Sequence, residues 1–239
     1  MIKLAVSGCL GRMGQRITQL ALEDKTFKIT ALLENPNYPN LADQHGPVKI
    51  TTEPSALKGN DVLIEFTTPE ATIEHLNACV KHRAKMVIGT TGLNHTQIKK
   101  IKAASKKIPI VFSSNMSVGV NILFKLAGEA AAKVGPDYRI KIIEAHHIHK
   151  KDAPSGTAKT IAEVIEEASG RKVSDIQSIR EGEIIGDHEI ILESNVDTIK
   201  ISHSAKTRDI FAKGSLVAAK FLAKKKTGLF NMQDVLGLK

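Results

Sequence analysis

The chain has 239 residues, enough for one large domain or two modest ones with a sizeable buried core. Its formal net charge of +9 favours anionic partners. Aromatic residues make up only 4% of the chain, too few for a base-stacking surface, and the lysines are scattered as on solvated helix faces. We therefore expect small anionic ligands and no nucleic acid.

The two cysteines, Cys9 and Cys79, form no CxxC or metal-binding pattern. Reduced thiols and a cytoplasmic protein are expected from this usage. The N-terminal residues run directly into a strand pattern, and no apolar run is long enough to cross a bilayer. Neither a signal peptide nor a membrane partner is expected.

A glycine-rich turn follows the first predicted strand. The apolar run Ile2–Ser7 predicts that strand, Gly8–Gly14 follows it, and a helical pattern comes next. A second strand, Phe27–Leu33, ends at Glu34. This order predicts a βαβ unit that binds a dinucleotide; the alternative is a glycine-rich turn without a ligand.

Each conspicuous residue of this unit has a physical role. Gly8 permits a tight turn, Gly11 lets the backbone approach a pyrophosphate, and Gly14 allows the helix to pack closely on the strand. Glu34 can accept hydrogen bonds from both ribose hydroxyls. Because a carboxylate repels a 2′-phosphate and Asn35 brings no positive charge, we expect NADH to be used at least as well as NADPH.

Strands and helices alternate up to residue 117, which predicts an open parallel sheet. The expected strands are Val48–Thr52, Asp61–Phe66, Lys85–Ile88 and Ile108–Phe112, and the expected helices are Glu70–His82 and Thr96–Lys107. Between them, Asn35–Pro47 is polar and rich in turn formers.

The next part of the chain is richer in strands. Helices are expected at Val118–Val134, Ala158–Ala168 and Arg208–Lys224, and strands at Tyr138–Ala145, Asp175–Arg180, His188–Glu193 and Thr198–His203. We expect antiparallel hairpins: one around the turn Glu181–Asp187 and one between the last two strands. Thr227–Lys239 is expected to be a tail. The predicted fold class is α/β: a Rossmann-like parallel-sheet domain plus an α+β domain with a mixed, largely antiparallel sheet.

The stretch Glu144–Ala158 gathers three histidines, two lysines and two carboxylates before a Pro-Ser-Gly-Thr turn. With this motif the chain resembles the 4-hydroxy-tetrahydrodipicolinate reductase (dihydrodipicolinate reductase) family over nearly its whole length. The other motifs that carry the resemblance are Gly8–Gly14, Phe66–Glu70, Gly89–Gly92, Asn115–Val120, Gly186–His188, Ile201–His203 and Phe211–Gly214.

The resemblance implies a dinucleotide-binding domain, residues 1–117 and 208–239, and a substrate-binding and oligomerisation domain, residues 118–207. It implies a homotetramer that uses NADH or NADPH to reduce a cyclic imine-type dicarboxylate to tetrahydrodipicolinate. Asp175–Gly186 is shorter than in many members, which trims the sheet expected to build the oligomer. The residues expected at the cofactor are Gly8, Cys9, Leu10, Gly11, Arg12, Met13, Gly14, Glu34, Phe66, Gly89, Thr90, Thr91, Ser113, Ser114, Asn115, Met116 and Arg208.

Hydride transfer to this acceptor leaves negative charge that a proton must quench. The resemblance implies His146 as proton donor, and a histidine titrates in the required range. Lys150 can stabilise the charge or donate the proton itself, so both are expected catalytic residues. Substrate contacts are expected from His147, Ser155, Gly156 and Thr157, because backbone N–H groups at a helix start form an anion site.

Each of these residues also has an alternative role. His146 could bond only to backbone and Lys150 could be solvated. Asp152 either orients Lys150 or braces the turn. No metal is expected, because successive histidines on a strand point to opposite faces. His149 is expected to be structural or to face solvent, and His188 and His203 to be structural.

Two other functions fit parts of the pattern. One is another NAD(P)-dependent dehydrogenase for an amino or imino acid, and the other is a dinucleotide-sensing regulator that binds DNA. A regulator needs no proton donor beside a carboxylate site, and no recognition helix is evident in the sequence.

Overall fold

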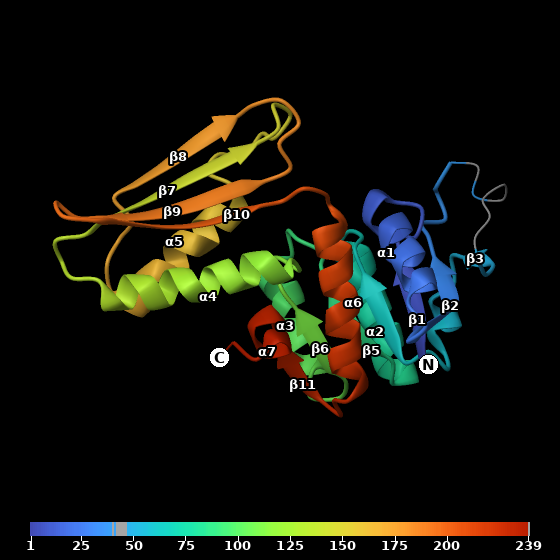
Figure 1. Cartoon of the computed structure of the whole chain (residues 1–239). Coiled ribbons are helices and arrows are strands. Elements are labelled where there is room, and N and C mark those ends of the chain that lie inside the picture. Colours follow the sequence, from blue (N-terminus) through green and yellow to red (C-terminus); the bar gives the residue numbers. More distant parts are fainter. Residues whose placement is uncertain (40, 42–46, 239) are drawn as a thin grey trace. The chain divides into compact units, whose positions relative to one another are not determined.

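The computed structural model describes residues 1–39, 41 and 47–238, so part of the predicted turn-rich segment Asn35–Pro47 lies outside the described residues. The chain forms two compact units (Figure 1). The first comprises Met1–Ser117 and Phe211–Gly237, and the second comprises Val118–Ile210. Within the described residues, no helix is both long and apolar enough to cross a membrane.

The first unit contains the expected parallel sheet. Its strand order is β11-β6-β5-β4-β1-β2-β3, and every neighbouring pair is parallel. Strand order reverses between β1 and β4, so the carboxyl ends of these strands are where a ligand of such a sheet is expected. The strands are β1 (Ile2–Ser7), β2 (Phe27–Leu33), β3 (Ile50–Thr51), β4 (Val62–Glu65), β5 (Lys85–Ile88), β6 (Pro109–Phe112) and β11 (Gly228–Phe230).

Local signals determine where the helices of this unit begin. In α2, Pro69 is the first helical residue and the Thr68 side chain accepts a hydrogen bond from Ala71 N–H. In α3, Asn94 and Gln97 form a capping box. The helices are α1 (Arg12–Glu23), the short 3₁₀ helix η2 (Pro54–Leu57), α2 (Pro69–His82), α3 (His95–Ala104), α6 (Asp209–Ala223) and α7 (Met232–Leu236).

The expected tail contains two further elements, so that prediction was wrong. Strand β11 pairs in parallel with β6, and α7 begins at Asn231 with a capping box. Three strand residues are too few to show a period, and β11 is stabilised by its pairing with a strand more than a hundred positions earlier.

The second unit is a four-stranded sheet in the order β10-β9-β7-β8, as the predicted mixed sheet requires. Its strands are β7 (Arg139–His146), β8 (Asp175–Arg180), β9 (Asp187–Glu193) and β10 (Thr198–Ser204). Helices α4 (Val118–Lys133) and α5 (Gly156–Ser169) lie on the same side of this sheet (Figure 1). They bury one row of its isoleucines, which are Ile176, Ile142, Ile190 and Ile201.

One of the two expected hairpins is present. Strands β9 and β10 pair antiparallel, with His188 opposite His203. The hairpin around Glu181–Asp187 was a wrong prediction: β8 pairs in parallel with β7, and β9 pairs with the other side of β7. Helix α5 returns the chain so that β8 runs beside β7 as in a βαβ unit. The connection of residues 181–186 therefore crosses the carboxyl end of β7.

Candidate functional site

The glycine-rich turn lies at the carboxyl end of β1, where strand order reverses. Gly8 has a positive φ of 65°, and a Cβ there would lie 2.9 Å from Thr67 Cγ2 after β4. A Cβ at Gly14 would lie 2.0 Å from the Gly8 carbonyl oxygen. The turn and the start of α1 can pack this closely only because Gly8 and Gly14 have no side chains.

The start of α1 suits an anionic group. Its N-cap, Gly11, offers no side-chain acceptor, and the first turn of the helix has no acidic residue. Backbone N–H groups at such a terminus, with the helix dipole, favour a phosphate. The Glu34 carboxylate lies next to this turn, with Oε2 accepting a hydrogen bond from Leu10 N–H at 2.8 Å and Oε1 accepting one from Asn35 N–H. These residues fit a dinucleotide.

Several other expected cofactor residues lie at neighbouring strand ends. A Cβ at Gly89 would be only 2.3 Å from the Phe66 ring, so the ring rests directly on that glycine. Thr90 is buried, and its hydroxyl accepts a hydrogen bond from Thr67 N–H at 3.2 Å. Thr91 is exposed.

The segment Ser113–Met116 follows β6 and packs against α6. A Cβ at Gly214 would be 1.7 Å from the Met116 carbonyl oxygen, so this contact requires a glycine. Ser113 donates a hydrogen bond to the Asn115 carbonyl, and Asn115 accepts one from Ser117 N–H. Arg208 is exposed and belongs to the second unit, so its inclusion in the cofactor set stays a prediction.

A buried ion pair beneath the glycine turn was missed. Glu65, at the end of β4, is fully buried, and its Oε2 lies 2.7 Å from His75 Nδ1 of α2. Ser7 Oγ contacts the same nitrogen at 3.1 Å, and the Thr67 hydroxyl donates to Glu65. Burial lowers the pKa of His75, but the Glu65 carboxylate raises it more, so its pKa lies above the usual value. In the sequence, only the acidic residue Glu65 at the end of an apolar strand pointed to this ion pair.

In the second unit, the buried face of the sheet changes from apolar to polar side chains toward the carboxyl end of β7. Two residues further along each strand from the buried isoleucines, four residues lie side by side across the sheet: Ser178, Glu144, His188 and His203. Two residues further along β7 is His146, opposite Arg180 on β8. Side chains two apart on a strand share a face, so His146 and Glu144 point the same way.

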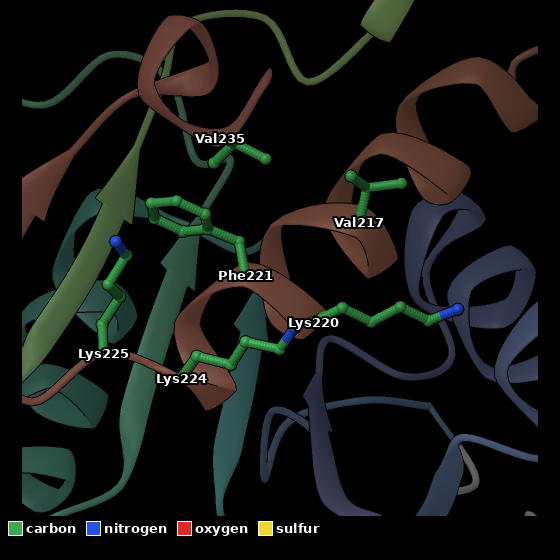
Figure 2. Close-up of a pocket in the computed structure, with 6 residues that line it drawn as sticks. All are labelled: Val217, Lys220, Phe221, Lys224, Lys225 and Val235. Atoms are coloured by element: carbon green, nitrogen blue, oxygen red, sulfur yellow. The ribbon is translucent and has the colours of Figure 1, made fainter. Parts of the chain in front are cut away.

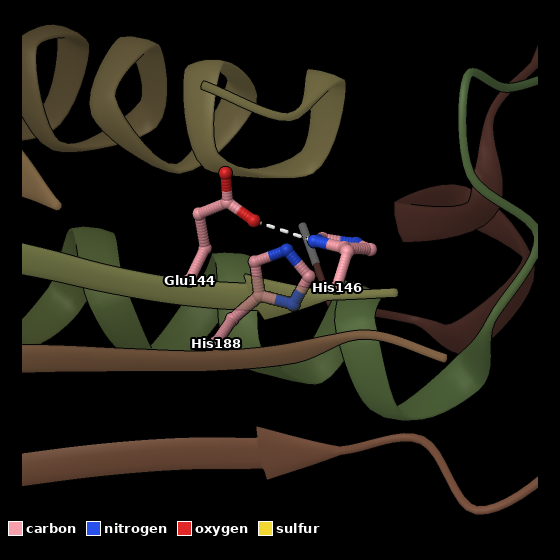
Figure 3. A group of neighbouring side chains, drawn as sticks. All are labelled: Glu144, His146 and His188. Carbon is pink, nitrogen blue, oxygen red and sulfur yellow. Dashed lines mark hydrogen bonds and ion pairs between the residues drawn. The ribbon is translucent and has the colours of Figure 1, made fainter. Parts of the chain in front are cut away.

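Glu144 is the centre of this group. It is 0% exposed, and its Oε2 lies 2.5 Å from His146 Nδ1 (Figure 3). Arg180 donates to both carboxylate oxygens, at 3.1 and 2.9 Å, and Ser155 N–H donates to Oε1 at 3.1 Å. Burial raises the pKa of Glu144, but the hydrogen bonds from Arg180, Ser178, His146 and Ser155 outweigh it and lower the pKa to about 2.

The two histidines beside Glu144 favour their neutral forms. Burial is the main cause that lowers the pKa of His146, although Glu144 opposes it. Burial and the neighbouring His146 lower the pKa of His188 to about 4. The two rings meet edge to face, with centroids 5.2 Å apart. His188 Nε2 also lies 3.3 Å from Ser155 Oγ, so His188 braces the residue that caps α5.

The loop after β7 carries the other expected residues. Lys150 Nζ lies 2.8 Å from Asp152 Oδ1, which agrees with Asp152 orienting Lys150. His149 is exposed, as expected. Ser155 is only 1% exposed, and its hydroxyl accepts a hydrogen bond from Ala158 N–H as the N-cap of α5. Gly156 is exposed, nothing lies within 4 Å of a Cβ placed on it, and its N–H interacts with the Asp152 carboxylate.

The same cluster must be considered as a metal site. Glu144, His146 and His188 each place one ligand atom within 4.8 Å of the others. The Arg180 guanidinium already binds both oxygens of the carboxylate, so a cation there would face an existing positive charge. The donor set therefore suits a proton-transfer group better than a metal ion.

A pocket of about 370 Å³ lies elsewhere, beside α6 and α7 (Figure 2). Two of its three lysines have partners: Lys225 Nζ lies 4.5 Å from the centre of the Phe221 ring, and Lys220 Nζ lies 2.6 Å from Asp24 Oδ2. Figure 2 shows Lys220 extending away from the other lining residues. The pocket includes none of the residues expected to bind cofactor or substrate.

A glycine turn at the reversal point of a parallel sheet, with a separate unit carrying a buried acid–histidine pair, fits a two-unit dinucleotide-dependent oxidoreductase. A family model described as dihydrodipicolinate reductase, N-terminus, matches residues 2–116, and one described as the C-terminus matches residues 119–236. The chain belongs to the dihydrodipicolinate reductase family, whose members are NAD(P)H-dependent oxidoreductases.

Individual relatives agree with this assignment. The 4-hydroxy-tetrahydrodipicolinate reductases of Nitrosomonas eutropha and Polynucleobacter necessarius are each 41% identical to the chain, over alignments of 266 and 265 residues. Each alignment covers 100% of this chain, with 99% and 100% of the relative. The fold matches the dipicolinate-bound dihydrodipicolinate reductase of Paenisporosarcina sp. TG-14, with a TM-score of 0.85, 24% identity and 98% of each chain covered.

Proposed function

We propose that this protein reduces 4-hydroxy-tetrahydrodipicolinate to tetrahydrodipicolinate in the diaminopimelate route to lysine, with uptake of one hydride and one proton and loss of the 4-hydroxyl group as water. Family membership across both units supports the reaction. The observation that carries the chemistry is the buried Glu144–His146 pair beside the start of α5, because it joins a proton donor to an anion site. A bound NAD(P)H supplies the hydride.

The first unit holds the dinucleotide. N–H groups of Gly11–Gly14 at the start of α1 bind the pyrophosphate, and Glu34 binds the ribose hydroxyls. Phe66 and Gly89, packed on one another after β4 and β5, would contact the bound cofactor. NADH serves at least as well as NADPH, because the Glu34 carboxylate repels a 2′-phosphate.

The second unit holds the substrate and its proton source. A substrate carboxylate binds the N–H groups of Gly156 and Thr157 at the start of α5, where Ser155 caps the helix. The dipicolinate in the Paenisporosarcina relative supports a small dicarboxylate ligand. His147 contacts the substrate, His146 donates the proton, and Lys150 stabilises the negative charge that develops before protonation.

The assay is oxidation of NADH or NADPH with the condensation product of pyruvate and aspartate semialdehyde. Wild type should turn over, and His146→Gln should lower kcat about 10²- to 10⁴-fold. Lys150→Ala should also lower kcat. His149→Gln, which changes an exposed histidine of the same motif, is the matched control and should keep full kcat.

Two results would contradict different parts of this proposal. Absence of turnover by wild type would exclude the reaction, and the same assay with other oxo and imino acids would then test the dehydrogenase alternative. Full kcat in both His146→Gln and Lys150→Ala would exclude the proposed catalytic residues but not the reaction. We also propose that the protein is cytoplasmic, because Cys9 and Cys79 are free thiols. We propose a homotetramer because the family resemblance implies one.

A further inference from the structure

We infer that Glu144 is a positioning residue that fixes the tautomer of His146 and stabilises its protonated form, and that Arg180 holds Glu144 in place. The inference rests on the proposed function, in which His146 donates the proton. Neither Glu144 nor Arg180 was among the residues expected from the sequence to act in the site.

The first step is that Glu144 is ionised and immobile. A buried carboxylate is costly unless several donors compensate it. Here two guanidinium N–H groups of Arg180 and the Ser155 N–H point at its two oxygens. The bidentate arrangement is also the most directional that an arginine can make. The carboxylate therefore stays negative and accepts hydrogen bonds only.

The second step concerns the two ring nitrogens of His146. Nδ1 lies 2.5 Å from Glu144 Oε2, and an ionised carboxylate can only accept, so Nδ1 must carry a hydrogen. Within the described residues, no hydrogen bond reaches Nε2. A Cβ at Gly186 would come within 3.0 Å of it. Nε2 is therefore the atom that can exchange a proton with the substrate. A side chain at position 186 would cover the Nε2 edge of the His146 ring, and glycine leaves it open.

The third step is that the same pair organises the loop that follows β7. Oε1 of Glu144 accepts the Ser155 N–H, and Arg180 Nη2 donates to the Asp152 carbonyl at 2.5 Å. One carboxylate thus contacts the proposed proton donor with one oxygen and the cap of the proposed carboxylate site with the other. The pairing of β8 with β7 brings Arg180 opposite His146 and within hydrogen-bonding distance of Glu144.

The charges around His146 determine what removing Glu144 should do. Glu144 favours the protonated ring, whereas Lys150 on the following loop and Arg180 on β8 disfavour it. His188 on β9 contacts the ring edge to face. Without the carboxylate, two positive charges and burial act unopposed, so the protonated form of His146 is lost at lower pH.

The central experiment compares wild type with Glu144→Gln, which keeps the shape of the side chain and removes its charge. We expect kcat to fall about 100-fold, with a smaller change in the affinity for dipicolinate as a substrate mimic. The basic limb of the kcat profile should move to lower pH. Glu181→Gln, which removes an exposed carboxylate on the neighbouring connection, should change neither.

A second readout does not depend on turnover. In protein labelled with ¹⁵N-histidine, long-range proton–nitrogen NMR reports which ring nitrogen carries the hydrogen. Neutral His146 should be protonated at Nδ1 in wild type, and its titration midpoint should be lower in Glu144→Gln. Protonation at Nε2 in wild type, or identical midpoints in the two proteins, would overturn the inference.

Three further results must be distinguished. If Glu144→Gln does not fold, Glu144→Asp retains the charge at a longer distance, and its basic limb should shift in the same direction by less. An unchanged profile in Glu144→Asp would then overturn the inference. Activity that is lost on dialysis against EDTA and restored by Zn²⁺ would also overturn it, in favour of a metal at this cluster. An inactive wild type would reject the proposed function, while the NMR result would still decide the role of Glu144.

Discussion

Gly186 lies beside Nε2 of His146, on the short connection that crosses the end of β7. A Cβ there would be 3.0 Å from Nε2 and 3.4 Å from Cδ2 of the same ring. Contacts this short force a neighbour to shift by a few tenths of an ångström. The absence of one side chain therefore keeps open the nitrogen that is proposed to donate the proton.

We predict that Gly186→Ala lowers kcat by about tenfold, because small misplacements of a reacting group are costly. The thermal unfolding midpoint should stay close to that of wild type, since the backbone of Gly186 is not in the left-handed region. Steady-state kinetics and a melting curve check both points, with Glu181→Ala as a control on the same connection. Wild-type kcat in Gly186→Ala would mean that Nε2 is not the donor atom.

Glu34 is the second residue whose chemistry makes a specific prediction. Its carboxylate is already fixed against Leu10 N–H at the glycine turn. Glu34→Gln keeps an oxygen acceptor and removes the charge that repels a 2′-phosphate. We expect kcat/KM for NADPH to rise about five- to tenfold relative to NADH, the size of one screened charge–charge interaction. An unchanged ratio would show that Glu34 does not face the 2′ position.

At the scale of elements, the Glu65–His75 pair joins β4 to α2 directly beneath the proposed cofactor turn. The pKa of His75 is raised in the folded protein because the carboxylate outweighs burial. A raised folded pKa means that the ion pair contributes fully to stability below the unfolded pKa. That contribution is lost as the pH rises through the folded pKa.

We therefore predict that His75→Gln lowers the free energy of unfolding most at acidic pH, by about 3 kcal/mol, as expected when one member of a buried pair is removed. The difference from wild type should shrink as the pH rises through the folded pKa of His75. Urea unfolding at a series of pH values measures this. His82→Gln, at the last residue of the same helix, is the control, and a pH-independent difference for His75→Gln would contradict the prediction.

At the scale of the whole molecule, the second unit leaves one sheet face without helices. The side chains of that face alternate with those buried under α4 and α5. Its apolar members are Ile143, Ala145, Ile179 and Ile191, all partly buried in the isolated chain. In the proposed homotetramer, a second copy of the chain would cover this sheet face.

We predict a particle of about four times the 25.9 kDa chain mass by light scattering. Ile191 lies between Lys141 and Lys200 in the sheet register, so Ile191→Lys would place three cations in one row. This variant should dissociate the oligomer. Val196→Lys makes the same change at an 89% exposed turn position and should not. A monomeric wild type would reject the homotetramer.

Many features of this protein can be predicted from short stretches of its sequence. The alternation of strands and helices, the glycine turn and the N-caps depend on residues within a few positions of one another, so periodicity and spacing predict them. The motif from Glu144 to Thr157 likewise brings a histidine and a helix start together because they are neighbours in the chain.

The rest depended on contacts that no local pattern encodes. Arg180 reaches Glu144 across 36 positions because α5 returns β8 to the side of β7, and His188 meets His146 because β9 pairs with the other side of β7. Strand β11 exists because β6 offers it an edge. Strand pairing is chosen by the packing of the whole sheet. The sequence alone therefore offered His146 and Lys150 as candidates for the proton donor, and only the tertiary structure placed the charges proposed to control His146.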